Sequence, residues 1–129
     1  MAELFDILNF KHTVVENQVI TTTEPDWTDL LTHSFNAPED GVYKLTFALQ
    51  FTLNSTSQSF LYRFSLDGGN TWGVVYSKEV KDRSNTEVIE VVNVEEITAG
   101  NKEIKLQVTR EGSADCSVIK AFISSERKA

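Results

Sequence analysis

Residues 43–53 read YKLTFALQFTL, from Tyr43 to Leu53, and no other part of the chain indicates a fold class as clearly. Aromatic and aliphatic residues occupy every second position, and mostly polar residues lie between them. Because successive side chains of a strand point to opposite faces, this period of two predicts a long strand with one buried face and one mostly polar face. Residues 60–66 and 104–108 repeat the alternation.

Other segments also have the composition of strands. Residues 13–23, 87–94 and 117–123 are rich in β-branched residues, and Trp72, Val74 and Tyr76 continue the alternation. Turn-forming residues separate the segments, at 38–41, 67–70, 82–85, 99–101 and 111–113. About eight strands at this spacing, with no convincing helical pattern, predict an all-β antiparallel β-sandwich or barrel.

Composition limits the function further. A chain of 129 residues has the length of one domain, and its net charge of −7 argues against nucleic acid or an anionic membrane as the main partner. No apolar stretch approaches the roughly 20 residues of a membrane span. The N-terminus shows no basic segment followed by an apolar one, so no secretion signal is expected. The single cysteine, Cys116, lies in an apolar run and is expected to be a small core residue.

Residues 65–72 read SLDGGNTW and match the Asp-box pattern S-x-D-x-G-x-T-W, which resembles that of sialidases and other sugar-handling propellers. A propeller needs several blades of about 40 residues each, so a 129-residue chain with one such box is too short. We therefore interpret the box as the turn of a hairpin, in which a carboxylate accepts hydrogen bonds across the turn. The residues assigned to this structural turn are Ser65, Asp67, Gly69, Thr71 and Trp72, the last covering the hairpin end.

Three segments resemble the jelly rolls of the tumour necrosis factor and complement globular-head superfamily. Residues 34–47, SFNAPEDGVYKLTF, are similar to the family's strand-turn-strand, and residues 97–106, ITAGNKEIKL, to its late "L-x-x-G-D-x-I-x-L" segment. Asn101 stands where the usual aspartate lies, and one residue is inserted. Residues 118–123 look like the last strand. The resemblance implies a jelly roll of about 8–10 strands that often assembles as a trimer.

Two expected strands are apolar on both faces, which favours self-association independently. A strand with one exposed face should alternate cleanly, whereas a strand covered on both faces need not. A loop of the same chain over a central strand is the alternative cover. The positions concerned are Val88, Ile89, Val91, Val92 and Val94, then Val118, Ile119, Ala121, Phe122 and Ile123.

The chain is expected to have three parts: an apolar arm over residues 1–11, a single jelly-roll domain over 12–126, and a polar tail over 127–129. The arm either caps its own domain or docks on a neighbouring subunit or larger assembly, because such apolar side chains are costly to expose. Its apolar residues are Leu4, Phe5, Ile7, Leu8 and Phe10.

A search for catalytic chemistry finds little. His12 and His33 have no cysteine or carboxylate at a metal-ligand spacing, and both are expected to be surface residues. No nucleophile elbow supports a serine hydrolase. The loop acids are interpreted as solvated rather than as calcium ligands: Asp26, Asp29, Glu39 and Asp40. We therefore expect no catalytic residue, no cofactor, no metal and no enzymatic activity.

With its acidic charge, single cysteine and apolar arm, the chain resembles the jelly rolls that bacteriophage heads carry as cement or decoration proteins, and this resemblance implies a structural protein of the virion, made in the host cytoplasm. It would be a capsid decoration, or cement, protein that bridges neighbouring subunits of the major capsid protein or another virion component, as a homotrimer. The apolar arm is the expected anchor and Trp27 a further contact, or else a lid over its own core. The alternative is a carbohydrate- or receptor-binding module of a phage tail or adhesin. Tyr62, Trp72 and Tyr76 follow the buried alternation, which leaves Trp27 as its exposed aromatic residue.

Overall fold

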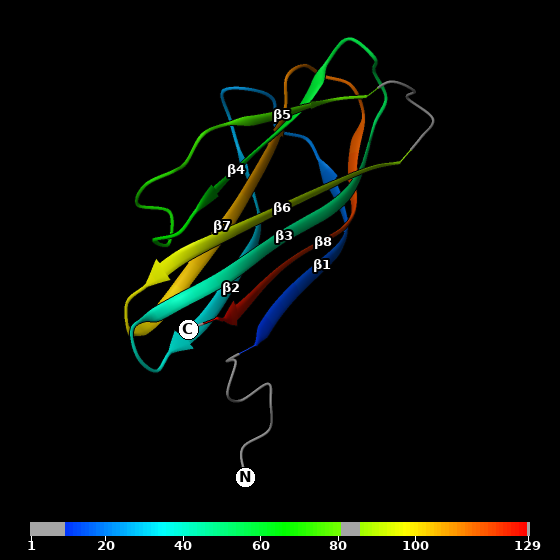
Figure 1. Ribbon diagram of the computed structural model, residues 1–129. Coiled ribbons are helices and arrows are strands. Elements are labelled where there is room, and N and C mark those ends of the chain that lie inside the picture. Colours follow the sequence, from blue (N-terminus) through cyan, green and yellow to red (C-terminus); the bar gives the residue numbers. More distant parts are fainter. Residues whose placement is uncertain (1–9, 81–85, 129) are drawn as a thin grey trace.

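The computed structural model describes residues 10–80 and 86–128, which form eight strands and no helix (Figure 1). The expected turn at 82–85 lies outside the described residues. The strands are β1 (Lys11–Ile20), β2 (Thr28–Ala37), β3 (Gly41–Leu53), β4 (Ser59–Ser65), β5 (Tyr76–Glu79), β6 (Glu87–Ile97), β7 (Gly100–Arg110) and β8 (Cys116–Arg127).

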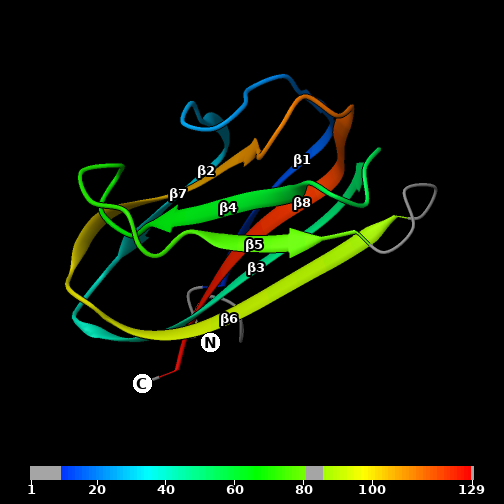
Figure 2. The ribbon, with the colours of Figure 1, turned by 90° about the horizontal axis from the view of Figure 1, so that it is seen from above.

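The strands form two four-stranded sheets packed face to face (Figure 2). Sheet A has the order β1-β8-β3-β6, sheet B has the order β2-β7-β4-β5, and all strand pairs are antiparallel. Consecutive strands therefore mostly alternate between the sheets, which is the strand order of a jelly roll. The expected all-β antiparallel sandwich of about eight to ten strands is confirmed.

The core lies between the sheets and is built on the alternation of β3. Tyr43, Leu45, Phe47, Leu49, Phe51 and Leu53 are all buried. Two aromatic pairs join the sheets across the core, since the ring centroids of Phe47 and Phe64 are 3.9 Å apart and those of Phe51 and Phe60 are 4.0 Å apart. Full burial of each such side chain contributes about 1.5–3 kcal/mol to the free energy of unfolding. Cys116 is buried in this core, as expected.

His33 was expected at the surface, and this expectation is wrong. The side chain points into the core from β2 and is 1% exposed. It occupies the inward register of β2, alternating with the outward positions Thr32 and Ser34. Thr13 and Ser125 of sheet A supply partners for its two ring nitrogens, which makes the burial tolerable.

The two sides of the sandwich differ. On one side β1 contacts β2, and β1 is interrupted at Asn17, which has a φ of 54° and no partner on β8. On the other side lie the edges of β5 and β6. Because β5 has 4 residues and β6 has 11, β5 accompanies only part of β6 (Figure 2).

Residues 87–94 were expected to be covered on both faces, by another subunit or by a loop over a central strand. The second alternative is wrong for the described residues, and cover by another subunit stays a prediction. β6 is an edge strand whose outer face points to solvent, and Val88, Val92 and Val94 are 60%, 48% and 65% exposed. On β8, a central strand, Ile119 is exposed and Phe122 partly exposed.

The expected strand through Trp72, Val74 and Tyr76 is also corrected. Residues 66–75 form a loop, and pairing with β4 begins only at Tyr76, opposite Tyr62. Val74 is 71% exposed and Tyr76 is 37% exposed, so the buried alternation does not extend to them. The backbone N–H of Gly73 donates to the carbonyl of Phe64, which draws the loop back over β4 and out of the strand ladder.

Candidate functional site

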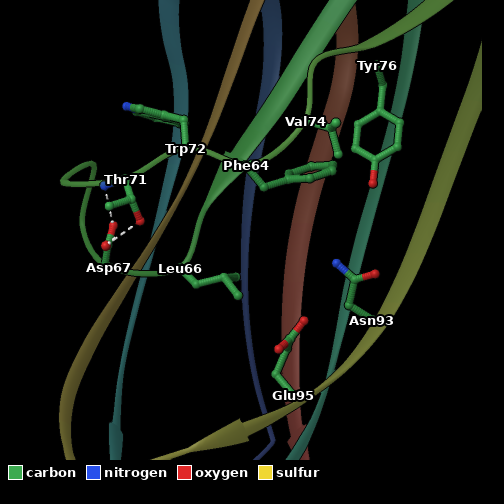
Figure 3. A pocket seen from close by; sticks show the side chains of 10 residues that line it. Phe64, Leu66, Asp67, Thr71, Trp72, Val74, Tyr76, Asn93 and Glu95 are labelled. Atoms are coloured by element: carbon green, nitrogen blue, oxygen red, sulfur yellow. Dashed lines mark hydrogen bonds between the residues drawn. The ribbon is translucent and has the colours of Figure 1, made fainter.

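The β4–β5 loop is organised around the carboxylate of Asp67. Oδ1 accepts the backbone N–H of Thr71 at 2.8 Å, and Oδ2 accepts the hydroxyl of Thr71 at 2.6 Å (Figure 3). Oδ1 also accepts the hydroxyl of Ser65 at 2.8 Å. The Ser65 hydroxyl oxygen also accepts the N–H of Gly69 at 2.8 Å. These bonds stabilise the ionised carboxylate and lower the pKa of Asp67 to about 2, with those from Thr71 contributing most.

Glycine allows this loop to turn tightly. Gly68 and Gly69 have φ values of 75° and 95°, which residues with a Cβ rarely adopt. The Trp72 ring lies against Gly69, since a Cβ added at Gly69 would be 3.6 Å from it. The Asp-box residues thus form a hydrogen-bonded turn within the ten-residue loop of residues 66–75, on the side of the sandwich where the edges of β5 and β6 lie.

Arg63 brings the two tryptophans together. Its guanidinium carbon lies 4.3 Å from the centroid of the Trp27 ring and 4.6 Å from that of Trp72. Arg63 Nε donates to Gln107 Oε1 at 2.9 Å, and Gln107 Nε2 donates to Asp29 Oδ1 at 2.6 Å. The pKa of Arg63 is lowered, mainly because the guanidinium is partly buried, and nearby Asp29 opposes this shift. Trp27 is therefore partly buried against a cation.

A groove of about 320 Å³, here called the side groove, lies between the β4–β5 loop and β6. Its apolar wall comes from β4, the loop and β5, and Asn93 and Glu95 project towards it from β6 (Figure 3). The ring of Tyr76 stacks on that of Tyr62, with the two centroids 5.2 Å apart. The pKa of Tyr62 is raised, mainly by burial and to a smaller extent by the electrostatic effect of Tyr76. The lining residues are Phe64, Leu66, Asp67, Thr71, Trp72, Gly73, Val74, Tyr76, Asn93 and Glu95.

A second feature is an apolar area on the outer face of sheet A, here called the valine surface. It consists of Val14, Val88, Val92 and Val94, with Phe122 and Ala48 between β1 and β6, and Glu90 lies on the same face between Val88 and Val92. A shallow groove of about 540 Å³ covers the part of it that includes Val14 and Val88, beside Gln50 and Lys120. Exposed apolar side chains gathered on one face are typical of a surface that another molecule covers.

The remaining expected site residues fall as follows. Leu4, Phe5, Ile7 and Leu8 of the arm lie outside the described residues, and Phe10 is partly exposed, with its ring centroid 6.0 Å from that of His12. The loop acids are dispersed: Asp29 accepts from Gln107, Glu39 pairs with Arg127 at 2.6 Å, and Asp40 accepts the N–H of Ala99. Among residues 10–80 and 86–128, no group of three His, Cys, Asp or Glu could hold a metal ion, and no helix could span a membrane.

Sequence reasoning missed three residues of these sites. Arg63, Asn93 and Glu95 come from β4 and β6, on different sheets, so no local pattern links them to Trp27 or Trp72. The one available signal was that Arg63, Asn93 and Glu95 interrupt apolar strands.

No protein-family model matches the chain, and no curated protein matches it in sequence. Its fold is similar to that in the structure of infectious bursal disease virus Gt strain, with a TM-score of 0.64 and 11% identity over 92% of this chain and 33% of that chain. The VP2 subviral particle of infectious bursal disease virus gives 0.61 and 10%, over 92% and 33%. Dimeric latent PorU from Porphyromonas gingivalis gives 0.50 and 9%, over 92% and 13%.

The chain spans about a third of the length of the viral chains that it resembles. At 9–11% identity these likenesses show the fold alone. They support the jelly-roll sandwich that the resemblance to the tumour necrosis factor and complement heads implied, and no family model assigns the chain to that superfamily.

Proposed function

We propose that this chain is a non-enzymatic structural protein of a virus particle: a bacteriophage decoration protein that bridges neighbouring capsid subunits as a homotrimer. The observation that carries the proposal is the valine surface, because Val88, Val92 and Val94 on one strand face are each about half exposed or more. Covering such a face removes apolar area from water and favours association.

The viral setting is supported by the fold. Solved structures with this sandwich include particles of infectious bursal disease virus, in which the chain's counterpart occupies about a third of a longer protein. A domain of this kind acts mechanically by burying area at the seams between subunits, and a trimer can hold several of them at once. The acidic charge of −7 suits protein partners rather than nucleic acid.

The test is the mass of the purified full-length chain by light scattering. We expect three times the monomer mass, and a shift towards the monomer in the double variant Val92→Glu, Val94→Glu, because the introduced charges would have to be buried. Val74→Glu, on an exposed loop position outside the valine surface, is the matched control. A monomer at all concentrations would overturn the trimer.

The arm is tested separately. The variant Leu4→Ser, Phe5→Ser, Leu8→Ser should keep the trimer and lose binding to capsids, measured by cosedimentation with the cognate particle. Loss of the trimer instead would place the arm between copies of the chain. Unchanged capsid binding would remove the arm as the anchor.

A carbohydrate-binding module is the second candidate, and the side groove favours it. Trp27 is a poor sugar platform because Arg63 lies over its ring, whereas Tyr76 lines the groove near the amide of Asn93 and the carboxylate of Glu95. An aromatic ring beside such groups is a usual site for a hydroxyl-rich ligand. On a glycan array, binding that Tyr76→Ala abolishes and Trp27→Ala preserves would support this candidate.

A further inference from the structure

We propose that the free edge of β6 binds, by strand addition, an extended segment of another protein that combines apolar residues with lysine or arginine. This inference rests on the proposed function, because it states how a partner would be held. It concerns the backbone N–H and C=O groups along the edge of β6, which belong neither to the valine surface nor to the side groove.

The edge is long and regular. β6 runs over 11 residues, which corresponds to about 36 Å of extended backbone, and its register with β3 is continuous from Gly41↔Ile97 to Phe51↔Glu87. It pairs with β3 on one side, and no described residue pairs with the other. A row of unpaired N–H and C=O groups of this length is a template for another strand.

The other edge of sheet A is blunted in ways that β6 is not. β1 carries Lys11 and the positive-φ residue Asn17, where its register with β8 is interrupted. Natural proteins use lysines, prolines and bulges to protect edge strands. β6, with the sequence EVIEVVNVEEI, contains no lysine, arginine, proline or glycine.

The faces of β6 match an added strand on both sides. Outward side chains of that strand would lie beside Val88, Val92 and Val94 and extend the valine surface. Inward side chains would stand next to Asn93 and Glu95, at the mouth of the side groove. Apolar contacts are therefore available on both faces, and a carboxylate faces the groove.

Charge decides the occupant. β6 carries four glutamates, at positions 87, 90, 95 and 96, and among the described residues none of them forms an ion pair. A second copy of β6 would bring the four glutamates of each strand together, and like charges between paired strands are destabilising. The chain's own arm contains Glu3 and Asp6 and no basic side chain before Lys11. A basic partner segment is complementary to β6.

The test uses three end-blocked octapeptides and the full-length protein. The first alternates lysine with valine, and the second alternates glutamate with valine. The third is the lysine peptide N-methylated at every residue, so that neither of its edges can donate hydrogen bonds. Binding is followed by amide chemical shifts of the ¹⁵N-labelled protein at physiological ionic strength.

We expect the lysine peptide to bind at least about tenfold more tightly than each of the other two, with shifts concentrated on β6 and the β4–β5 loop. The double variant Glu90→Lys, Glu95→Lys should weaken its binding at least about tenfold, whereas the matched control Glu16→Lys, on the opposite edge of sheet A, should not.

Several results would overturn the inference. Equal binding of the N-methylated peptide would show charge attraction without strand addition, and equal binding of the glutamate peptide would remove the charge argument. Protection that rises with protein concentration alone, at the β6 amides that point away from β3, would identify a second copy as the occupant of the edge. If the peptides fail while Val92→Glu, Val94→Glu still changes the mass and capsids still bind, strand addition is wrong and the proposed function stands.

Discussion

His33 Nε2 on β2 lies 2.9 Å from the hydroxyl oxygen of Ser125 on β8, and this hydrogen bond joins the two sheets inside the core. The hydroxyl of Thr13, on β1, lies 2.9 Å from Nδ1, so both ring nitrogens have partners on the opposite sheet. Burial, with a smaller effect of His12, lowers the pKa of His33 from 6.5 to about 4.

The first prediction is that acid destabilises the fold through His33. Between pH 6.5 and 4 the unfolded chain binds a proton at this residue that the folded chain does not, so the free energy of unfolding falls as the pH falls. The loss is about 3 kcal/mol at most by pH 4, and urea unfolding at pH 7 and pH 4.5 measures it.

His33→Gln should be less stable at pH 7 and should lose part of this pH dependence. The control is His12→Gln, which changes the exposed neighbour and should keep most of it. An unchanged slope in His33→Gln would show that carboxylates alone cause the acid sensitivity.

The second prediction concerns Asp67. Asp67→Asn replaces one acceptor oxygen by an NH2 group, which cannot accept a hydrogen bond. Either the Thr71 hydroxyl or the pair formed by the Ser65 hydroxyl and the Thr71 N–H then loses its acceptor, so the β4–β5 loop should open more often while the sandwich persists. Amide hydrogen exchange at Thr71 should accelerate on the order of tenfold, with little change in Tm. Asp26→Asn, in another exposed loop, is the control. Because the pKa of Asp67 is about 2, the wild-type loop should keep its slow exchange down to about pH 3.

The residues of β3 show how far sequence alone reaches. Their alternation is local and strong, so the fold class and the buried face followed from it. Residues 72–75 continue the same local pattern and do not form a strand, because Asp67 and the Gly73–Phe64 hydrogen bond hold them in a loop. His33 shares the inward-facing register of Leu31 and Phe35, but a polar side chain is expected at the surface when its partners are unknown. Ser125 and Thr13, which are distant in sequence, are the hydrogen-bond partners that allow its burial.

The order of the strands in the two sheets could not be predicted from local sequence patterns either. The position of β6 at an edge depends on pairing between segments that are distant in sequence. A valine-rich strand has the same sequence pattern whether it lies at the edge or in the centre of a sheet. The contacts of Arg63 with Trp27 and Trp72 join β4 to two loops far apart in sequence. These parts of the candidate sites could be found only in three dimensions.

The third prediction is that Cys116 does not react in the folded protein. Burial raises the pKa of its thiol to about 12, although Arg110 opposes the shift, and little of the reactive thiolate exists at pH 8. A disulfide reagent should modify Cys116 at the rate of unfolding, and urea should accelerate the reaction. Fast modification without denaturant would show that the end of the sandwich at β8 opens locally.

The last prediction is that Arg63 couples Trp27 to Trp72. Each cation–π contact at a partly exposed site contributes about 0.5–1 kcal/mol, so Arg63→Ala should lower the free energy of unfolding by about 1–2 kcal/mol and alter tryptophan fluorescence. Arg63→Lys should restore part of the stability, since it keeps the charge but loses the planar guanidinium and the hydrogen bond to Gln107. Double-mutant cycles of Arg63→Ala with Trp27→Ala and with Trp72→Ala should each give a coupling energy of about 0.5–1 kcal/mol. A coupling of zero with Trp27 would show that this ring packs on the strands without help from Arg63, and it would restore Trp27 as a platform for a ligand.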